Sequence, residues 1–514
     1  MGAAVTNRRK VALVGAVIAS EIGYASLLTL DPPRDLEWLM LIVGSLFTLL
    51  AAAYFVTRRD AASPGPRLIV LVALAFRLTL VPLGLPPDAG VSDRMTMIRE
   101  DMSGGEVRFR RELLLDDDVW RYLWDAHVAA QTSNPYRAAP IDPELDRLAS
   151  GAGPSGRWRV IRSNVNHPDL ATIYPPVAQA VFLGAYLVAP GSVVALKLVL
   201  VAVDMAGIAA LLLLLRRLDR PPSIALLYAW NPLVILMFSG AAHVDVVAVA
   251  CMTWSAYLIT RSRYSASGVA LGLAILTKVA PLVLVPLFVR TAGKRGAAGV
   301  ALTLVLVASP LLLVDEGLSA SFRQFAQNWE FNSASFTLMR YLLSGLTNDP
   351  GRVTRVLLAS VIVLAVAYIA TRKPSSASFS GRAADTLGIL LLCSPTLMPW
   401  YAPWPLALAV AGGRRAWIAM SAALVLAFPM MVDWTTRSGL LAVEAGLILL
   451  ALAGQWRGTR SDCLGSTDRE QSFSEADART TSSKALRLAV EECRAGVLVN
   501  ERRDRHAQAD VAAP

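Results

Sequence analysis

The sequence predicts an all-α polytopic membrane protein of about 12–14 transmembrane or half-spanning helices. Of its 514 residues, 55% are hydrophobic and only 17% are charged, a balance typical of membrane proteins rather than of soluble domains. Apolar runs long enough to cross a bilayer recur along most of the chain. Arginine and lysine collect at the ends of these runs, as they do in the cytoplasmic loops of membrane proteins.

Apolar runs of about 20 residues, the length that a bilayer core requires, predict the individual spans. They cover residues 11–30, 38–56, 67–85, 193–215, 296–314, 353–370, 416–432 and 438–455. Segments 223–240 and 243–260 also qualify, although Asn231-Pro232 interrupts the first and His243 and Asp245 open the second. The first run is longer than a signal-peptide core and lacks a small-residue cleavage site, so we expect it to be a retained anchor.

Basic residues predict the orientation of the chain. They precede the first run and follow or precede later ones, at Arg58, Arg59, Arg67, Arg216, Arg217, Arg220, Arg261, Arg263, Arg457 and Arg460. All of these can lie in the cytoplasm together, which places both termini inside and residues 86–192 outside, after three spans. The net charge of +10 then reflects membrane topology, and we expect no nucleic-acid partner.

Two segments have basic residues on both sides, and an odd number of crossings there would break the charge pattern. Ser267 to Val289 carries Lys278 near its middle, and Ala384 to Ala411 carries Pro399-Trp400-Tyr401. We predict two helical hairpins whose tips, Lys278 and Trp400-Tyr401, rise toward the outer face in a recessed cavity. The alternative for each segment is one long tilted helix with a snorkelling or paired residue.

The chain is thus expected to have four parts. Residues 1–85 form an N-terminal three-span segment, and 86–192 an extracytoplasmic catalytic loop with an interfacial helix near Thr172 to Ala189. Residues 193–455 form a transmembrane core with the hairpins and a second external loop from Asp315 to Arg352. The tail, 456–514, is rich in Ser, Thr, Arg, Glu and Ala, which predicts a largely disordered cytoplasmic extension, where Ala485 to Val497 could form a short helix.

An acidic run, Asp116-Asp117-Asp118, opens the stretch that is most suited to chemistry. Acidic residues favour a helix N-terminus, and on such a helix Asp118, Arg121, Tyr122 and Asp125 share one polar face. A carboxylate there can remove a proton from a hydroxyl, while cations receive the charge of a departing phosphate. The alternative is an N-cap followed by a solvated acidic helix.

Further polar residues follow along the chain: Tyr136 after Asn134-Pro135, His167 before a proline, and Tyr174 before two prolines, then His243, Asp245 and Lys278 in apolar surroundings. Aromatic rings beside polar groups suit a sugar-binding or membrane-interface surface. Ionisable groups at membrane depth are candidates for function, and a lysine is a suitable phosphate ligand. For His243 and Asp245 the alternative is a hydrogen-bonded helix start. Arg77 is expected to pair with Glu21 or Asp204.

Metal binding is left open by the sequence. The four cysteines are scattered, without the spacing of a metal site or a disulfide framework. Three carboxylates in a row could hold a divalent cation, but no second cluster of ligands accompanies them. No other cofactor is expected.

The run DDDVWRYLWDAHVAAQTSNPY, followed by HPDLATIYPPVAQAVF, resembles the signature of bacterial GT-C membrane glycosyltransferases that use polyprenyl-phosphate sugars. It is most similar to polyprenol-phosphate-mannose-dependent mannosyltransferases of mycobacterial and related envelopes. The stretches YAWNPLVILMFSGAAHVDVVAVA, AILTKVAPLVLVPLF and LMPWYAPW also look familial, so that the resemblance covers about residues 70–455. One departure is that Val244 follows His243, where relatives often have His, Asn and Asp in succession.

The resemblance implies a hexosyltransferase of the cytoplasmic membrane, with a polyprenyl-phosphate sugar donor, an envelope glycan or glycolipid acceptor outside that membrane, and usually inversion at the transferred sugar. By position, the base is Asp117 or Asp118, and Asp116 is the weakest candidate of the three. Arg121, Lys278 and His243 are then candidates for the donor phosphate, and Tyr174 and Trp400, with its neighbour Tyr401, for the walls of the lipid or sugar cleft. A secondary transporter or flippase of envelope precursors is the alternative function.

Overall fold

The computed structural model describes residues 2–32, 34–58, 64–150, 156–309, 317–373, 375–432 and 439–455. The chain divides into two units, 1–451 and 452–514, and the elements below belong to the first, apart from residues 452–455 at the end of the last helix. Its secondary structure is helical, apart from two isolated bridges among the described residues, which confirms the all-α polytopic fold. The predictions for the tail, 456–514, lie outside the described residues.

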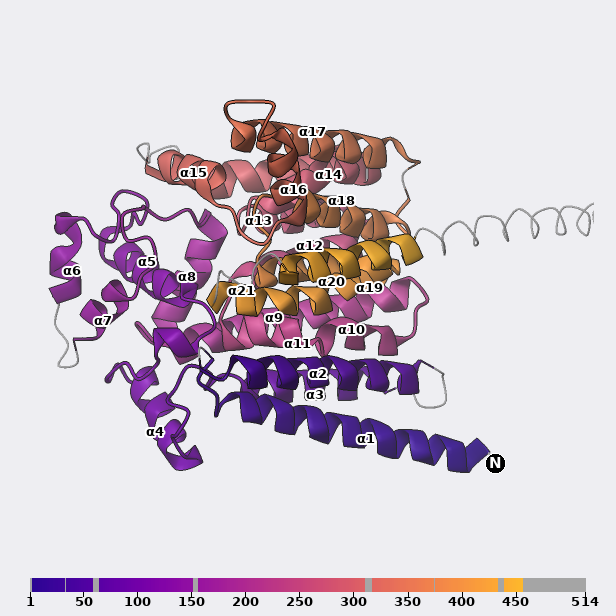
Figure 1. Cartoon of the computed structure of the whole chain (residues 1–514), viewed down its shortest axis with the longest axis horizontal. Coiled ribbons are helices and arrows are strands. Elements are labelled where there is room, and N and C mark those ends of the chain that lie inside the picture. The colour runs from indigo at the N-terminus through magenta and orange to yellow at the C-terminus, as the bar shows by residue number, and fades with distance from the viewer. Residues whose placement is uncertain are drawn as a thin grey trace, which may run out of the picture. The chain divides into compact units, whose positions relative to one another are not determined.

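The N-terminal segment forms three neighbouring helices, α1 (Gly2–Leu27), α2 (Leu36–Thr57) and α3 (Pro66–Thr79), which lie side by side in Figure 1. The third is shorter than the predicted run, because the chain turns at Leu80 and continues irregularly to Leu85. A buried ion pair then joins α3 to the core, with Arg77 Nε 2.7 Å from Asp204 Oδ2. This confirms the expected partner of Arg77, while Glu21 accepts from Thr79 instead.

The core begins with α9 (Val193–Arg217), a broken span and α12 (Asp245–Thr260). In the broken span, α10 (Leu226–Ala229) and α11 (Pro232–Ile235), continued to Gly240 by η5 (Leu236–Gly240), meet at a bend of 51°. Pro232 cannot donate to the preceding turn, and the Asn231 side chain accepts from Leu233 and Val234 instead. Asn231-Pro232 therefore bends the span rather than merely interrupting it.

The first predicted hairpin is present, with a break between α13 (Tyr264–Ile275) and η6 (Ala280–Leu284) that contains Lys278. The next helix, α14 (Val285–Ala308), has a non-helical residue at Gly293 (φ 63°, ψ −162°). Gly268 lies against the backbone of Gly296, and Gly272 against Thr303. The residue numbers of the contacting partners increase in the same direction along both helices, so α13 runs parallel to the second half of α14. Residues 280–292, which connect the two in sequence, must therefore run in the opposite direction.

The second predicted hairpin is also present. It consists of α18 (Phe379–Cys393), η8 (Pro399–Tyr401) and α19 (Pro403–Gly412). Gly381, near the start of α18, lies against Gly412 at the end of α19, so the two arms are antiparallel. Trp400 and Tyr401 are therefore at the tip, as predicted.

The remaining helices are α15 (Gly317–Asn328), α16 (Ala334–Leu343), α17 (Pro350–Thr371), α20 (Arg415–Ala423), η9 (Leu424–Leu426), α21 (Ala427–Val432) and a last helix, Gly439–Gln455. By length and apolar composition, five described helical stretches could cross a membrane, and the bent pair makes a sixth. One of the five, Ala280–Ala308, is the stretch that Gly293 breaks. The predicted number of 12–14 helices included shorter and half-spanning helices. Breaks at Lys278, Gly293 and Pro399 leave several helices too short to cross a bilayer alone.

The first large loop folds into a helical region at one end of the first unit. It contains α4 (Val91–Met102), η2 (Arg111–Leu113), α5 (Asp118–Thr132), η3 (Pro143–Leu145), α6 (Asp146–Ser150), α7 (Arg157–Ser163) and α8 (Pro176–Val188). Figure 1 shows α4–α8 together at this end, with the N-terminus at the other. We call the two ends the loop end and the N-terminal end.

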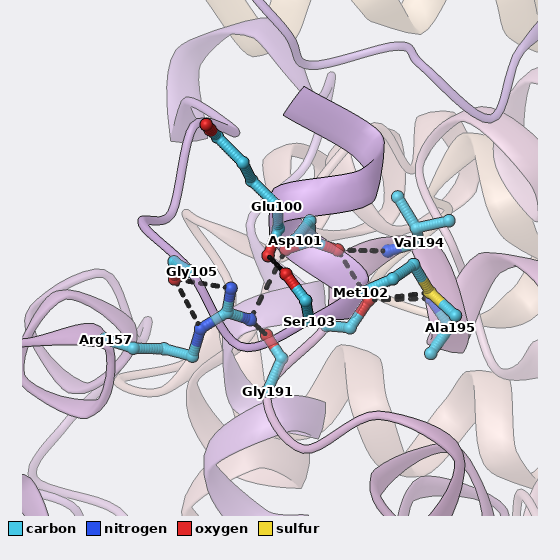
Figure 2. A network of polar contacts seen from close by, with 10 residues as sticks. Glu100, Asp101, Met102, Ser103, Gly105, Arg157, Gly191, Val194 and Ala195 are labelled. Atoms are coloured by element: carbon cyan, nitrogen blue, oxygen red, sulfur yellow. Dashed lines mark hydrogen bonds and ion pairs between the residues drawn. The ribbon is translucent and has the colours of Figure 1, made fainter. Parts of the chain in front are cut away.

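A buried polar network fastens this loop to the core (Figure 2). Asp101 accepts from the Ser192 hydroxyl (2.5 Å) and from the backbone N–H of Val194 (3.0 Å), where α9 begins. Arg157 Nη1 is 3.4 Å from Asp101 Oδ1, and its guanidinium also donates to the carbonyl oxygens of Gly105 and Gly191. The network thus joins α4, α7 and α9.

Asp101→Ala is expected to lower the free energy of unfolding by about 3–5 kcal/mol, since it leaves the buried Arg157 guanidinium without its carboxylate. Thermal unfolding in detergent would measure the loss. Glu100→Ala is the matched control, because Glu100 is in the same helix and pairs only at the surface with Arg108, where a pair contributes about 0–1 kcal/mol. Equal melting temperatures for the two variants would contradict the structural role of Asp101.

Candidate active site

The acidic run lies where α5 begins, with Asp118 as its first residue. This start agrees with the prediction, because negative charge at a helix N-terminus interacts favourably with the helix dipole. Every residue from Val119 to Val128 is buried. A solvated acidic helix is therefore excluded, and the polar face of α5 looks into the protein.

Asp118 and Asp117 are held together by one side-chain amide. The Asn166 Nδ2 nitrogen donates to Asp118 Oδ1 at 2.8 Å and to Asp117 Oδ1 at 2.7 Å. Asp118 Oδ2 accepts a further hydrogen bond from the Tyr174 hydroxyl at 2.8 Å, whereas Asp117 pairs with the partly exposed Arg111. Asp118 is thus the carboxylate whose partners all lie inside the site.

The carboxylates at the two ends of the run differ in their protonation. Burial alone would raise the pKa of Asp118, but the fields of His243 and Lys278 and two side-chain hydrogen bonds hold that pKa below its ordinary value. Burial and the neighbouring carboxylates raise the pKa of Asp116 well above its ordinary value. At neutral pH, Asp118 is accordingly the anion and Asp116 favours the protonated form.

Asn166 was missed in the sequence, where a single amide in a loop has no distinguishing pattern beyond the His167-Pro168 turn that follows it. Arg121 holds this loop in place. Its guanidinium donates to the backbone carbonyl oxygens of Asn166 (2.7 Å), His167 (2.8 Å) and Leu170 (3.0 Å). These contacts give Arg121 a positioning role and leave it less available for the phosphate that the sequence suggested.

His243 faces the acidic run from the core. Its Nε2 lies 3.1 Å from Asp116 Oδ2 and its Nδ1 lies 3.9 Å from Asp118 Oδ2, although neither approach has hydrogen-bond geometry. The ring is fully buried and stacks on Trp400 with centroids 4.1 Å apart. The tip of the second hairpin therefore positions the imidazole beside both carboxylates.

Lys278, at the tip of the first hairpin, lies near the same carboxylates. Its Nζ is 3.3 Å from Asp245 Oδ2, and Asp245 also accepts from the Trp404 indole at 2.8 Å. The rings of Tyr174 and Tyr401 lie 5.3 Å and 5.7 Å from Nζ. The ammonium group is thus held by one carboxylate and two aromatic faces, with room for a further anion.

Two adjacent cavities are lined by several of these side chains, though not by His243 or Asp245. The smaller, about 200 Å³, is called the reaction cavity and is lined by Asp116, Asp117, Asp118, Arg121, Asn166, His167, Leu170, Ala171, Ile173, Tyr174, Lys278, Phe325, Trp329, Met398, Trp400 and Tyr401. The larger, about 810 Å³, is called the apolar cavity, and its walls come mainly from η6, α14, α15, α17 and α18. Both are lined by Ile173, Tyr174, Lys278, Phe325, Trp329 and Tyr401, so they meet at the lysine.

Three predicted residues contact residues of the candidate site or their neighbours without lining the reaction cavity. The Tyr136 hydroxyl donates to the carbonyl oxygen of Tyr174 at 3.0 Å. Asp125 accepts from the Gln179 side chain at 3.0 Å. Tyr122, whose hydroxyl is 3.3 Å from Asp118 Oδ2, stacks on Phe182. His167 does line the reaction cavity, with its ring against Trp329.

The side chains of Asp116, Asp118 and His243 would hold a divalent cation if the reaction uses one. Their ligand atoms lie within 4.8 Å of one another, and two carboxylates with an imidazole are ligands for several divalent metals. Asp118 already accepts hydrogen bonds on both oxygens.

Residues 172–395 match the model for Glycosyltransferase family 87. The matched segment includes Tyr174, His243, Asp245 and Lys278, and it ends before Trp400. No curated protein matches the chain. The family match, together with several membrane-length helices, indicates a multi-pass membrane glycosyltransferase, and hence a sugar donor, an acceptor and a membrane environment.

Proposed function

We propose that this membrane glycosyltransferase moves a sugar, mannose in the first instance, from a polyprenyl-phosphate donor to a hydroxyl of an extracytoplasmic envelope glycan or lipid. The observation that carries the proposal is the junction of the apolar cavity with the reaction cavity at Lys278. A long apolar chain fits the larger space, an anionic phosphate fits the ammonium group, and the sugar would then lie against Asp118.

The chemistry follows from this order of groups. The acceptor hydroxyl oxygen attacks the anomeric carbon, its proton passes to the Asp118 carboxylate, and the bond from that carbon to the phosphate oxygen breaks with its electron pair on oxygen. Lys278 receives the phosphate charge. Asn166 holds Asp117 and Asp118 in place by hydrogen bonds, and the His243 ring lies beside Asp116 and Asp118. One displacement of this kind inverts the configuration at the anomeric carbon.

The same proposal places the active site outside the cytoplasmic membrane. Helices α9, α12 and α17 end beside Arg217, Arg261 and Arg372, and α20 begins at Arg415. The ends of α9 and α12 lie away from the loop end, because both helices start beside the large loop. Arg220, just after α9, lies against Gly413, just before α20. Arg382, near the start of α18, donates to the carbonyl oxygen of Arg372, and this start lies against Gly412. Basic flanks favour the cytoplasm, which supports an extracytoplasmic loop end.

Purified protein in liposomes tests the proposal when offered polyprenyl-phosphate mannose, arabinose or glucose, with envelope glycans and glycolipids as acceptors. We expect transfer from the mannose donor, and parallel reactions with chelator report whether a divalent cation takes part. Movement of the donor across the bilayer without any transferred sugar would favour the transporter or flippase instead. A nucleotide sugar is offered in a separate reaction, and transfer from it but from none of the polyprenyl-phosphate sugars would contradict the lipid donor.

A further inference from the structure

The last helix, Gly439–Gln455, carries a buried carboxylate that lines neither of the two cavities. Glu444 is 2% exposed, whereas its neighbour Val443 is 54% exposed. Both oxygens of the Glu444 carboxylate accept from the same nitrogen, Asn332 Nδ2, at 3.1 Å. An ionisable residue held inside a membrane protein is a candidate for function, with its partner as the first clue to that function.

Two short segments that line the cavities run side by side near this pair. The first wall segment, residues 329–333, begins with Trp329, which lines both the reaction cavity and the apolar cavity. The second wall segment, residues 394–398, ends with Met398, which lines the reaction cavity and precedes the hairpin tip. An isolated parallel bridge joins the two segments. A shift of this pair of segments would therefore move one wall of each cavity.

Asn332 connects the wall segments to the last helix. Its Nδ2 donates to the carbonyl oxygen of Leu397 at 3.2 Å as well as to Glu444, and the whole residue is buried. Its Oδ1 has no partner among the described residues, so the acceptors of Nδ2 alone orient the amide. One carboxylate thus holds one amide, and that amide contacts both wall segments.

The other contact between the last helix and the wall segments is apolar. Phe331 and Leu441, one turn before Glu444, belong to the same buried cluster, together with Ala427 and Met430. Apolar burial is non-directional, whereas a hydrogen bond depends on the distance and angle between its groups. Glu444 is therefore the residue of this helix that can fix where the wall segments lie.

We propose that Glu444 is a positioning residue for donor binding. Through Asn332 it holds Trp329 at the junction of the two cavities, where the lipid and the phosphate of the donor would meet. The effect on the donor rests on the proposed function, whereas the effect on the wall segments does not. Glu444 lies outside residues 172–395, the segment that matches the family model, and Asn332 lies inside it. The last helix thus adds a contact of this chain's own to the matched segment.

Four variants separate this role from a general contribution to folding. Glu444→Leu removes both acceptor oxygens, and Glu444→Gln keeps one of them. Asn332→Gly removes the amide, and glycine tolerates the φ of 51° at this position without strain. Val443→Ala is the matched control, because Val443 is the exposed neighbour on the same helix. Thermal unfolding in detergent identifies any variant that is misfolded.

Two measurements are made on each variant in liposomes. Initial rates with polyprenyl-phosphate mannose give the KM for the donor and kcat. Hydrogen–deuterium exchange of residues 329–333 and 394–398 reports the motion of the wall segments and needs no substrate.

Glu444→Leu is expected to raise the donor KM by about fivefold or more and to leave kcat within about threefold, because a loosened wall weakens donor binding in the ground state and the transition state alike. Amide exchange in the wall segments should become faster. Asn332→Gly should match Glu444→Leu, and the double variant should add nothing further, because both residues act through the same hydrogen bonds. Glu444→Gln and Val443→Ala should stay within about twofold of the wild type.

An unchanged donor KM with unchanged exchange in Glu444→Leu would overturn the proposal, and so would equal losses in Glu444→Leu and Glu444→Gln. A lower melting temperature with an unchanged donor KM would assign Glu444 to folding alone. If Glu444→Leu does not fold, the comparison of Asn332→Gly with Val443→Ala decides in the same way. An absence of wild-type transfer from every polyprenyl-phosphate sugar would overturn the proposed function, while the exchange data would still decide whether Glu444 positions the wall.

Discussion

Asp118→Asn is expected to lower kcat by about 10²–10⁴-fold, the range that a positioned general base contributes. The amide keeps the shape of the carboxylate but cannot accept the proton of the acceptor hydroxyl. Initial rates of sugar transfer in liposomes, with both substrates saturating, would measure the loss. The KM for the donor should change much less, since Asp118 acts on the hydroxyl rather than on the phosphate.

Asp116→Asn gives the sharpest comparison. Because Asp116 favours its protonated form, an amide imitates its usual state, and we expect kcat within about tenfold of the wild type. Asp93→Asn, at an exposed aspartate of α4 in the same loop, controls for the substitution itself. Losses of similar size at Asp116 and Asp118 would contradict the assignment of the base to Asp118 alone.

Lys278→Met should reduce kcat/KM for the donor by about 10²–10³-fold, because the departing phosphate loses its nearest cation. This variant also leaves the buried Asp245 without its ion-pair partner, which could destabilise the fold by about 3–5 kcal/mol. Lys278→Met combined with Asp245→Asn removes both charges and separates the two effects.

The double variant should recover the melting temperature of the wild type without recovering the rate. Lys278→Arg, which keeps the charge, should retain more activity than either. If the double variant transferred sugar at the wild-type rate, Lys278 would have a structural role only, and the phosphate would need another ligand.

Hydropathy and charge were sufficient to predict the helical class, both hairpins and the start of α5. These features depend on local composition or on the need to bring the chain back to the side of its basic flanks. The bend at Asn231-Pro232 and the early end of α3 were not predicted, because an apolar run reports the burial of a segment but not its direction.

The grouping of the candidate site residues in space was predicted in part. The structure brings together Asp118, Tyr174, His243, Lys278 and Trp400, residues far apart in the chain that were selected for their chemistry at the ends of apolar runs. Asn166 and Arg111 were missed, and Arg121 contacts carbonyl oxygens instead of being free for a phosphate. Such roles depend on how loops meet in space, which a single sequence does not encode in any periodic pattern.

The backbone of Gly293 determines which residues of the second half of the chain can meet the first. A φ of 63° with a ψ of −162° is open to glycine but strained for any other residue. Had α14 continued straight, the number of crossings would change parity, and Trp329 would emerge at the N-terminal end, far from His167. Both cavities would lose the wall that Phe325 and Trp329 provide, so one achiral residue keeps the two halves of the candidate site on a common side.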